Sequence, residues 1–254
     1  MGHPADATHD HHRSLFIGHE KVAGVNFWGD PKRDVPGPTI RQDAWVHYQD
    51  GADEAGIAVD LGWYDAHKVR LIQHQVIAVF RPLADGEGWV ELQSTFTPEL
   101  DELQLGKTNF GFFGLRVAAS LSALYGGGRL TSGEGDVGEP AIFQQPAKWV
   151  DYSGPIVETA EEGVTWFDHP TNSRHPPRWH VRDDGWFSPA FCQRDGYALR
   201  KTSPLRLRYG LHLHRGAYDA QRALTTFNAF AAAAAYKLEK ADKPWKWHLK
   251  RATT

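Results

Sequence analysis

The chain has 254 residues, 41% of them hydrophobic and 23% charged, and its formal net charge is −3 at pH 7. This balance gives no reason to expect a nucleic acid or a membrane as partner. A single cysteine excludes an internal disulfide framework, and no apolar run is long enough for a transmembrane helix or a secretory signal, so we expect a cytoplasmic protein.

Short apolar segments bounded by Gly, Pro and Asp recur in the first half of the chain and predict β-strands. Such segments occupy residues 14–19, 25–28 and 39–48. Residues 69–80 (VRLIQHQVIAVF) are rich in β-branched side chains, and residues 89–97 (WVELQSTFT) alternate between polar and apolar. Only a short turn separates these last two segments, so they are predicted to form a hairpin.

The same pattern continues in the second half. Residues 110–120 predict a strand whose glycines indicate bulges or a close backbone approach. The glycine-rich residues 126–140 predict a loop, and shorter strands are expected at residues 149–152 and 164–167.

Residues 205–214 (LRLRYGLHLH) alternate most regularly, with four leucines and a tyrosine on one face and arginines, a glycine and histidines on the other. The alanine-rich residues 218–240 predict the only helix. Many strands followed by one C-terminal helix indicate an all-β protein: a large antiparallel β-sandwich that forms a single domain over residues 1–254.

Titratable side chains gather in residues 9–28 (HDHHRSLFIGHEKVAGVNFW). His9 and His11 stand two residues apart and would share one face of an extended segment, which suits a divalent metal. His212 and His214 repeat this spacing on the polar face of the last strand. The alternative for each pair is a set of solvated or backbone-bonded histidines.

Residues 166–185 (WFDHPTNSRHPPRWHVRDDG) form a second such stretch. Its prolines predict a stiff loop, and the loop carries a carboxylate, imidazoles, an amide and guanidinium groups, which is a set able to perform general acid/base catalysis. For Asp168 and Asn172 the alternative is turn capping. We expect this stretch and the first one to meet in a polar cleft.

These blocks resemble the PmoA-like family of bacterial proteins: HDHHRSLFIGH followed by GVNFW, KWVDYSG at residues 148–154, and GVTWFDHPTNSRHPPRWHVRDDG at residues 163–185. Two departures are Thr8, where the family usually has Asp before its first histidine, and the absence of strands that usually precede the first block. The resemblance implies a galactose-mutarotase-like β-sandwich (supersandwich) that binds sugars on a polar concave face. The family's label, methane oxygenase, belongs to a membrane subunit and does not suit this chain.

The sequence contains no glycine-rich nucleotide motif and no nucleophile elbow. Together with the acid/base side chains, the resemblance implies the favoured hypothesis, a carbohydrate-processing enzyme, namely an epimerase, lyase or hydrolase acting on a sugar or an oxidised sugar through His/Asp/Arg acid/base chemistry. The alternatives are a non-catalytic carbohydrate-binding module and a metal-dependent oxygenase, as the family label suggests. The expected partner is a small-molecule carbohydrate, and the one cofactor considered is a divalent metal.

Three sets of candidate residues follow from these hypotheses. The candidate catalytic residues are His11, His12, His169 and Asp168. The candidate substrate-binding residues are Arg13, His19, Asn26, Trp28, Asn172, His175, Trp179, His180 and Arg182. The candidate metal ligands are His9, His11, His212 and His214.

Overall fold

Eight strands pair into one antiparallel sheet with the strand order β2-β3-β4-β5-β14-β10-β9-β8. The computed structural model describes residues 13–29, 36–158, 160–240 and 247–252. The eight strands are β2 (Thr39–Gln49), β3 (Ala55–Tyr64), β4 (Arg70–Pro82), β5 (Gly88–Pro98), β8 (Arg129–Ser132), β9 (Trp149–Val157), β10 (Ala160–Asp168) and β14 (Leu205–Arg215). The predicted hairpin is confirmed, since β4 and β5 pair continuously from Ile72↔Pro98 to Pro82↔Gly88.

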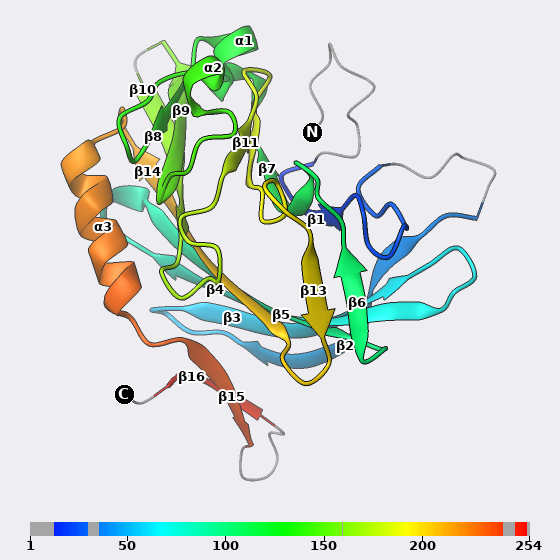
Figure 1. Cartoon of the computed structure of the whole chain (residues 1–254). Coiled ribbons are helices and arrows are strands. Elements are labelled where there is room, and N and C mark those ends of the chain that lie inside the picture. Colours follow the sequence, from blue (N-terminus) through cyan, green and yellow to red (C-terminus); the bar gives the residue numbers. More distant parts are fainter. Residues whose placement is uncertain (1–12, 30–35, 159, 241–246, 253–254) are drawn as a thin grey trace.

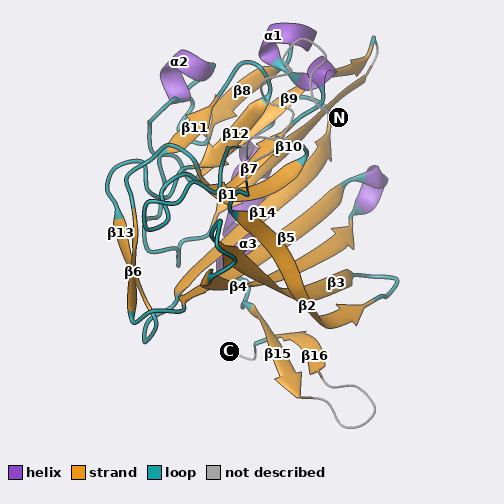
Figure 2. Ribbon diagram, turned by 90° about the vertical axis from the view of Figure 1, so that its right-hand side faces the viewer, coloured by secondary structure: helices purple, strands orange, loops and turns teal. Residues whose placement is uncertain are grey.

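A second, four-stranded sheet packs against the inner face of the first, so the fold is an all-β sandwich (Figures 1 and 2). Its order is β1-β7-β12-β11, formed by β1 (Leu15–His19), β7 (Gly111–Arg116), β12 (Trp186–Pro189) and β11 (Trp179–Val181). Large side chains from both sheets fill the space between them, including Trp63, Phe96, Phe112, Trp166 and Tyr209. Burial of such apolar surface is the main force that holds the two layers together.

The outer face of the eight-stranded sheet is covered by two C-terminal elements (Figure 1). Helix α3 (Ala220–Ala232) lays Phe227 and Phe230 against Trp89, Trp149 and Phe167. The hairpin formed by β15 (Tyr236–Lys240) and β16 (Trp247–Arg251) places its buried side chains against Ala58, Ile77 and Val79. The sandwich therefore has an apolar core inside and smaller apolar contacts outside.

The remaining elements are short. A two-stranded sheet is formed by β6 (Glu102–Leu105) and β13 (Tyr197–Arg200). The short helices are η2 (Ala84–Gly86), η3 (Ala119–Leu121), α1 (Ala123–Gly126) and α2 (Glu139–Ile142). Among the described residues, no helix is long and apolar enough to cross a membrane.

The structure corrects three of the predicted elements. The helix predicted over residues 218–240 ends at Ala232, because the chain then leaves to form β15. The strand predicted at residues 25–28 does not form: a turn at Ala23 and Gly24, with φ angles of 49° and 83°, leads only to a single bridge between Val22 and Val25. The loop predicted at residues 126–140 contains β8, which pairs with β9 at the edge of the large sheet.

Candidate functional site

The end of β10 places Asp168 beneath the loop that follows, and this loop brings His175 back onto it. Asp168 is only 2% exposed. Its Oδ2 atom lies 2.7 Å from Nδ1 of His175, and its Oδ1 atom accepts a 2.6 Å hydrogen bond from the side-chain amide of Asn172. Both carboxylate oxygens therefore have a partner, and one of them fixes the orientation of an imidazole ring.

Asp168 and His175 form an Asp–His dyad, the arrangement in which a carboxylate orients a histidine for proton transfer. Burial raises the pKa of Asp168, while the hydrogen bonds from His175 and Asn172 act in the opposite direction. Because Nδ1 of His175 is occupied by Asp168, the Nε2 atom on the far side of the ring is the one left for a ligand. It has no hydrogen-bond partner among the residues that the structure describes.

His175 lines a cavity of about 530 Å³ whose other charged side chains are mainly arginines. The cavity is lined by Pro146, Arg174, His175, Pro176, Pro177, Arg178, Ala190, Phe191, Arg194 and Asp195. Three arginines face one aspartate there, and Asp195 is paired with Arg194 at 3.5 Å. The excess positive charge and the volume suit a small anionic ligand.

The two inner arginines are held in place by backbone carbonyl groups. Arg174 donates hydrogen bonds of 2.7, 2.7 and 2.6 Å to the carbonyl oxygens of Phe191, Asp195 and Gly196. Arg178 donates to the carbonyl oxygen of Gln144. Carbonyl groups orient the guanidinium groups but carry no full negative charge, so they leave the positive charge of the cavity uncompensated.

His169, predicted as a catalytic residue, does not form the dyad. Its Nε2 atom lies 3.0 Å from Nη1 of Arg208 and its Nδ1 atom lies 2.8 Å from the hydroxyl of Thr171. Burial and the positive charge of Arg208 lower the pKa of His169 to about 4. His169 is therefore a neutral acceptor for Arg208, and Asp168 orients His175 in its place.

Two residues predicted to position the substrate hold the protein itself together. Asn172 is buried, and both ends of its amide bind protein groups: Asp168 and the backbone N–H and C=O of Arg208. Trp179 is fully buried in the core, and its indole N–H donates a 2.8 Å hydrogen bond to the carbonyl oxygen of Ala147. For Trp179 the prediction of substrate contact is wrong.

The structure describes only part of the first predicted stretch, residues 9–28. His9, His11 and His12 lie outside the described residues, and Arg13, at the beginning of the described chain, is exposed. Asn26 uses its side-chain oxygen to accept hydrogen bonds from the backbone of the following turn, at Trp28 and Gly29. The side chain of Asn26 therefore stabilises this exposed turn.

The two predicted stretches do meet, but around aromatic rings. The ring centroid of Trp28 lies 5.7 Å from that of Trp186 and 5.3 Å from that of Phe110. The ring centroid of His180 lies 4.2 Å from that of Trp186 and 5.2 Å from that of Phe110. Burial lowers the pKa of His180 to about 4. Within the described part of the chain, the expected polar cleft is thus replaced by an aromatic cluster.

Two further predicted residues, His19 and Arg182, do not line the cavity beside the dyad. His19 is fully buried, and burial, together with the positive charge of Lys21, lowers its pKa to about 4. Its Nδ1 atom accepts a 3.1 Å hydrogen bond from the backbone N–H of Lys21. Arg182 points to the protein surface, where it forms a 3.0 Å salt bridge with Glu139.

The two histidines of β14 bind separate carboxylates on the face beneath α3. His212 lies 2.8 Å from Glu87, and His214 lies 2.7 Å from Asp151. Among the described residues, no group of three or more His, Cys, Asp and Glu side chains is arranged to hold a metal ion. The predicted pair His212 and His214 therefore does not form such a group.

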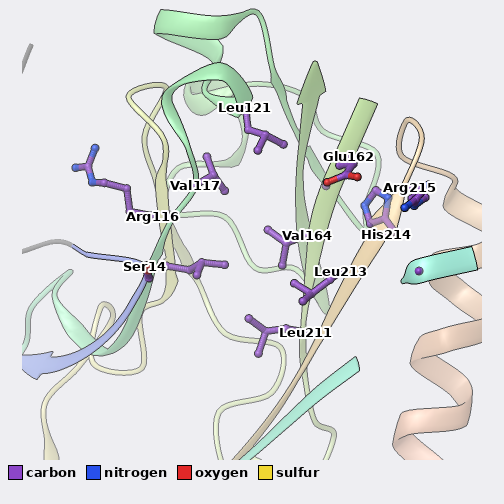
Figure 3. Close-up of a pocket in the computed structure, with 13 residues that line it drawn as sticks. Ser14, Arg116, Val117, Leu121, Glu162, Val164, Leu211, Leu213, His214 and Arg215 are labelled. Atoms are coloured by element: carbon purple, nitrogen blue, oxygen red, sulfur yellow. The ribbon is translucent and has the colours of Figure 1, made fainter. Parts of the chain in front are cut away.

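His214 also borders a cavity of about 400 Å³ at the end of the sandwich (Figure 3). Most of its walls are aliphatic and come from both sheets: Leu115, Val117, Leu121, Val164, Leu211 and Leu213. Figure 3 shows Glu162, His214 and Arg215 together on one side of it. Both ring nitrogens of His214 have protein partners, Asp151 at Nε2 and Arg222 at Nδ1, so this histidine leaves no nitrogen for a ligand and the cavity offers weaker acid/base chemistry than the arginine-lined one.

The prediction from sequence missed the cavity arginines. Arg174 and Arg178 flank His175-Pro176-Pro177 within the second predicted stretch, so their proximity to one another was visible in the sequence. Arg194 comes from a later turn, and only the fold brings it to the cavity.

The fold and the site describe a β-sandwich protein with an Asp–His dyad beside an arginine-lined cavity. The chain belongs to a family of unknown function (DUF6807), whose model matches residues 1–228. No curated protein matches the chain. A putative kojibiose phosphorylase from the human microbiome is a similar solved structure, with a TM-score of 0.37 and 7% identity; the match covers 85% of this chain and 28% of the phosphorylase.

Proposed function

We propose that the protein is a carbohydrate-processing enzyme that removes a proton from an oxidised sugar, at the carbon next to the sugar's carboxylate. The observation that carries this proposal is the 2.7 Å contact between Asp168 and His175 in the wall of the arginine-lined cavity. The dyad supplies a base, and the arginines supply the charge that holds a carboxylate.

The chemistry follows from these two parts. Nε2 of His175 takes the proton, and the electron pair left on carbon delocalises into the substrate carboxylate. Arg174 and Arg178 stabilise the extra negative charge that develops there. Protonation of the opposite face of the carbon by water, with loss of the His175 proton to solvent, gives epimerisation. Departure of an oxygen substituent from the next carbon, as a hydroxyl group that takes up the proton from His175 or from water, gives elimination and a carbon–carbon double bond.

The first test is a His175→Ala variant assayed with a panel of uronate oligosaccharides. Proton exchange with deuterated water, followed by NMR, detects both reactions, and ultraviolet absorbance detects the double bond of an elimination product. We expect the variant to lose about 10²–10⁴-fold in turnover, the usual contribution of a general base. His67→Ala is the matched control, because His67 is an exposed histidine in the β3–β4 turn. Equal turnover in the His175 variant and the control would remove the dyad from the mechanism.

The arginines are tested in the same assay. Arg178→Ala is expected to raise the KM for a uronate substrate, and Arg200→Ala, which alters an exposed arginine paired with Glu102, is expected to leave it unchanged. A neutral sugar turned over as fast as the uronate would contradict the assignment of an oxidised sugar.

A further inference from the structure

The outer face of the large sheet carries a groove beside the β15–β16 hairpin, away from the dyad's cavity. This outer groove has a volume of about 760 Å³, and its lining includes Trp45, Asp60, Gln75, Thr95, Arg206 and Trp247. Its volume lies within the range of small-ligand sites. We propose that the outer groove binds a neutral oligosaccharide chain.

The floor of the outer groove is a row of polar side chains aligned across four strands. Asp60 pairs with Gln75, Gln75 with Thr95, and Thr95 with Arg206, so the row crosses β3, β4, β5 and β14. With neighbouring strands about 4.8 Å apart, the row is about 14 Å long. It can therefore contact several sugar units in succession.

The row offers both donors and acceptors to a ligand. Within the described part of the chain, the hydrogen bond found between its members is the 3.2 Å bond from Gln75 to Asp60. The second carboxylate oxygen of Asp60, the hydroxyl of Thr95 and the guanidinium of Arg206 remain available for sugar hydroxyl groups. The row carries one acidic and one basic side chain, and Lys237, which lines the hairpin side of the groove, is paired with Glu239 at 2.7 Å. These charges offset one another, which favours a neutral ligand over a charged one.

Aromatic and apolar side chains form the walls. Trp45 on β2 is 64% exposed, and Trp247 and Tyr236 stand on the hairpin side. Indole rings present flat apolar faces that pack on sugar rings. The hairpin is fixed to the sheet beside the groove, since Gln93 exchanges hydrogen bonds of 2.8 and 2.6 Å with the backbone of Tyr236. The wall is thus held at a defined distance from the floor.

The outer groove continues along the sheet as a smaller cavity of about 250 Å³, with which it shares Gln93, Thr95, Arg206 and Ala235. This extension reaches Thr171, in the loop that also carries His175. The extended shape fits a chain of sugar units better than a single one. A second copy of the protein fits less well, because β2 has two register shifts and carries Arg41 and Asp43 at the sheet edge.

The test is isothermal titration calorimetry of the full chain with cellohexaose, xylohexaose, mannohexaose and maltohexaose. We expect saturable binding of at least one of them, and about tenfold weaker binding by Trp45→Ala through loss of ring stacking. Tyr48→Ala is the matched control: Tyr48 is on the same strand and also 64% exposed, but it does not line the outer groove. We expect its affinity to equal that of the unaltered protein.

We expect the His175→Ala variant to bind the hexasaccharide with unchanged affinity. This measurement distinguishes the outer groove from the proposed active site. Failure of all four hexasaccharides to bind, or equal losses in the Trp45 and Tyr48 variants, would overturn the proposal. A dimer in sedimentation velocity that Trp45→Ala dissociates would also overturn it, because the groove would then be an interface between two copies.

Discussion

Asp168 shows how much of this site depends on one buried carboxylate. A carboxylate after a strand commonly caps a turn. Here the side chain is buried and divides its two oxygens between His175 and Asn172. Burial makes each of these hydrogen bonds important, because a buried charge without partners is costly. The residue therefore connects the strand end, the loop and the base of the proposed reaction.

Substitution of Asn172 tests whether the hydrogen bonds around Asp168 stabilise the folded protein. We expect Asn172→Ala to lower the free energy of unfolding by about 1–3 kcal/mol, because it leaves the buried N–H of Arg208 and one oxygen of Asp168 without their partner. Urea denaturation measures this. Asn26→Ala removes an exposed amide that also binds two backbone N–H groups, and should cost less since water replaces it. Similar losses in the two variants would contradict the role assigned to Asn172.

At the residue scale, the sequence predicted the composition of the candidate site better than its geometry. Asp168 and His175 were both predicted as site residues, and the structure places them in contact. The partner's identity depends on two successive turns, in which the backbone N–H groups of Asn172 and His175 donate to the carbonyl oxygens of His169 and Asn172. Residue spacing alone does not determine these turns. Trp179 was misassigned because inward and outward positions of a three-residue strand cannot be distinguished from so short a pattern.

At the scale of elements, the end of α3 is determined by tertiary contacts. Arg208 donates hydrogen bonds of 2.7 and 3.1 Å to the carbonyl oxygens of Ala233 and Ala234, just beyond the last helical residue. The chain then pairs with Gln93 at Tyr236. These contacts override the helix propensity of the alanine run, which is why the helix is shorter than predicted.

The start of α3 has a local signal that can be tested directly. The side chain of Asp219 accepts a 2.7 Å hydrogen bond from the backbone N–H of Arg222. Asp219→Ala should lower the free energy of unfolding by about 1 kcal/mol. Asp219→Ser should lower it by much less, because serine also caps helices. Thermal or urea unfolding of both variants checks this, and a Ser variant as unstable as the Ala variant would argue against capping.

Strands with regular alternation were predictable, and irregular ones were not. The segments that became β4, β5 and β14 have clear patterns and were found. Strand β3 was missed, since Gly56, Asp60 and Gly62 interrupt its apolar pattern. The β15–β16 hairpin was missed because its strands are short and carry many charges, and its burial depends on apolar side chains of the sheet beneath it.

At the scale of the whole molecule, several buried histidines make stability depend on pH. Burial lowers the pKa to about 3 for His74 and to about 4 for His19, His169 and His180. Below pH 6.5 the unfolded chain takes up protons on these rings, whereas the native rings stay neutral until about pH 4. The free energy of unfolding should thus fall on acidification, by up to about 1.4 kcal/mol per pH unit for each ring.

Urea unfolding at about pH 7.5 and about pH 5 measures this dependence. His180→Gln should show a smaller difference between the two conditions than the unaltered protein, because one titrating ring is lost. His67→Gln, at an exposed position, should show the same difference as the unaltered protein. A stability that is constant from neutral to acidic pH would contradict the assignment of neutral buried rings.

The β15–β16 hairpin lies beyond residue 228, where the family match ends, whereas Asp168 and His175 lie within it. The residues of the proposed reaction and the hairpin wall of the proposed oligosaccharide groove therefore lie in different parts of the chain, while the floor of that groove lies within the family match. A relative with a different C-terminal extension would keep the dyad but present another wall to the sheet. Exchanging residues 236–251 between two such relatives should transfer oligosaccharide preference while leaving the reaction unchanged.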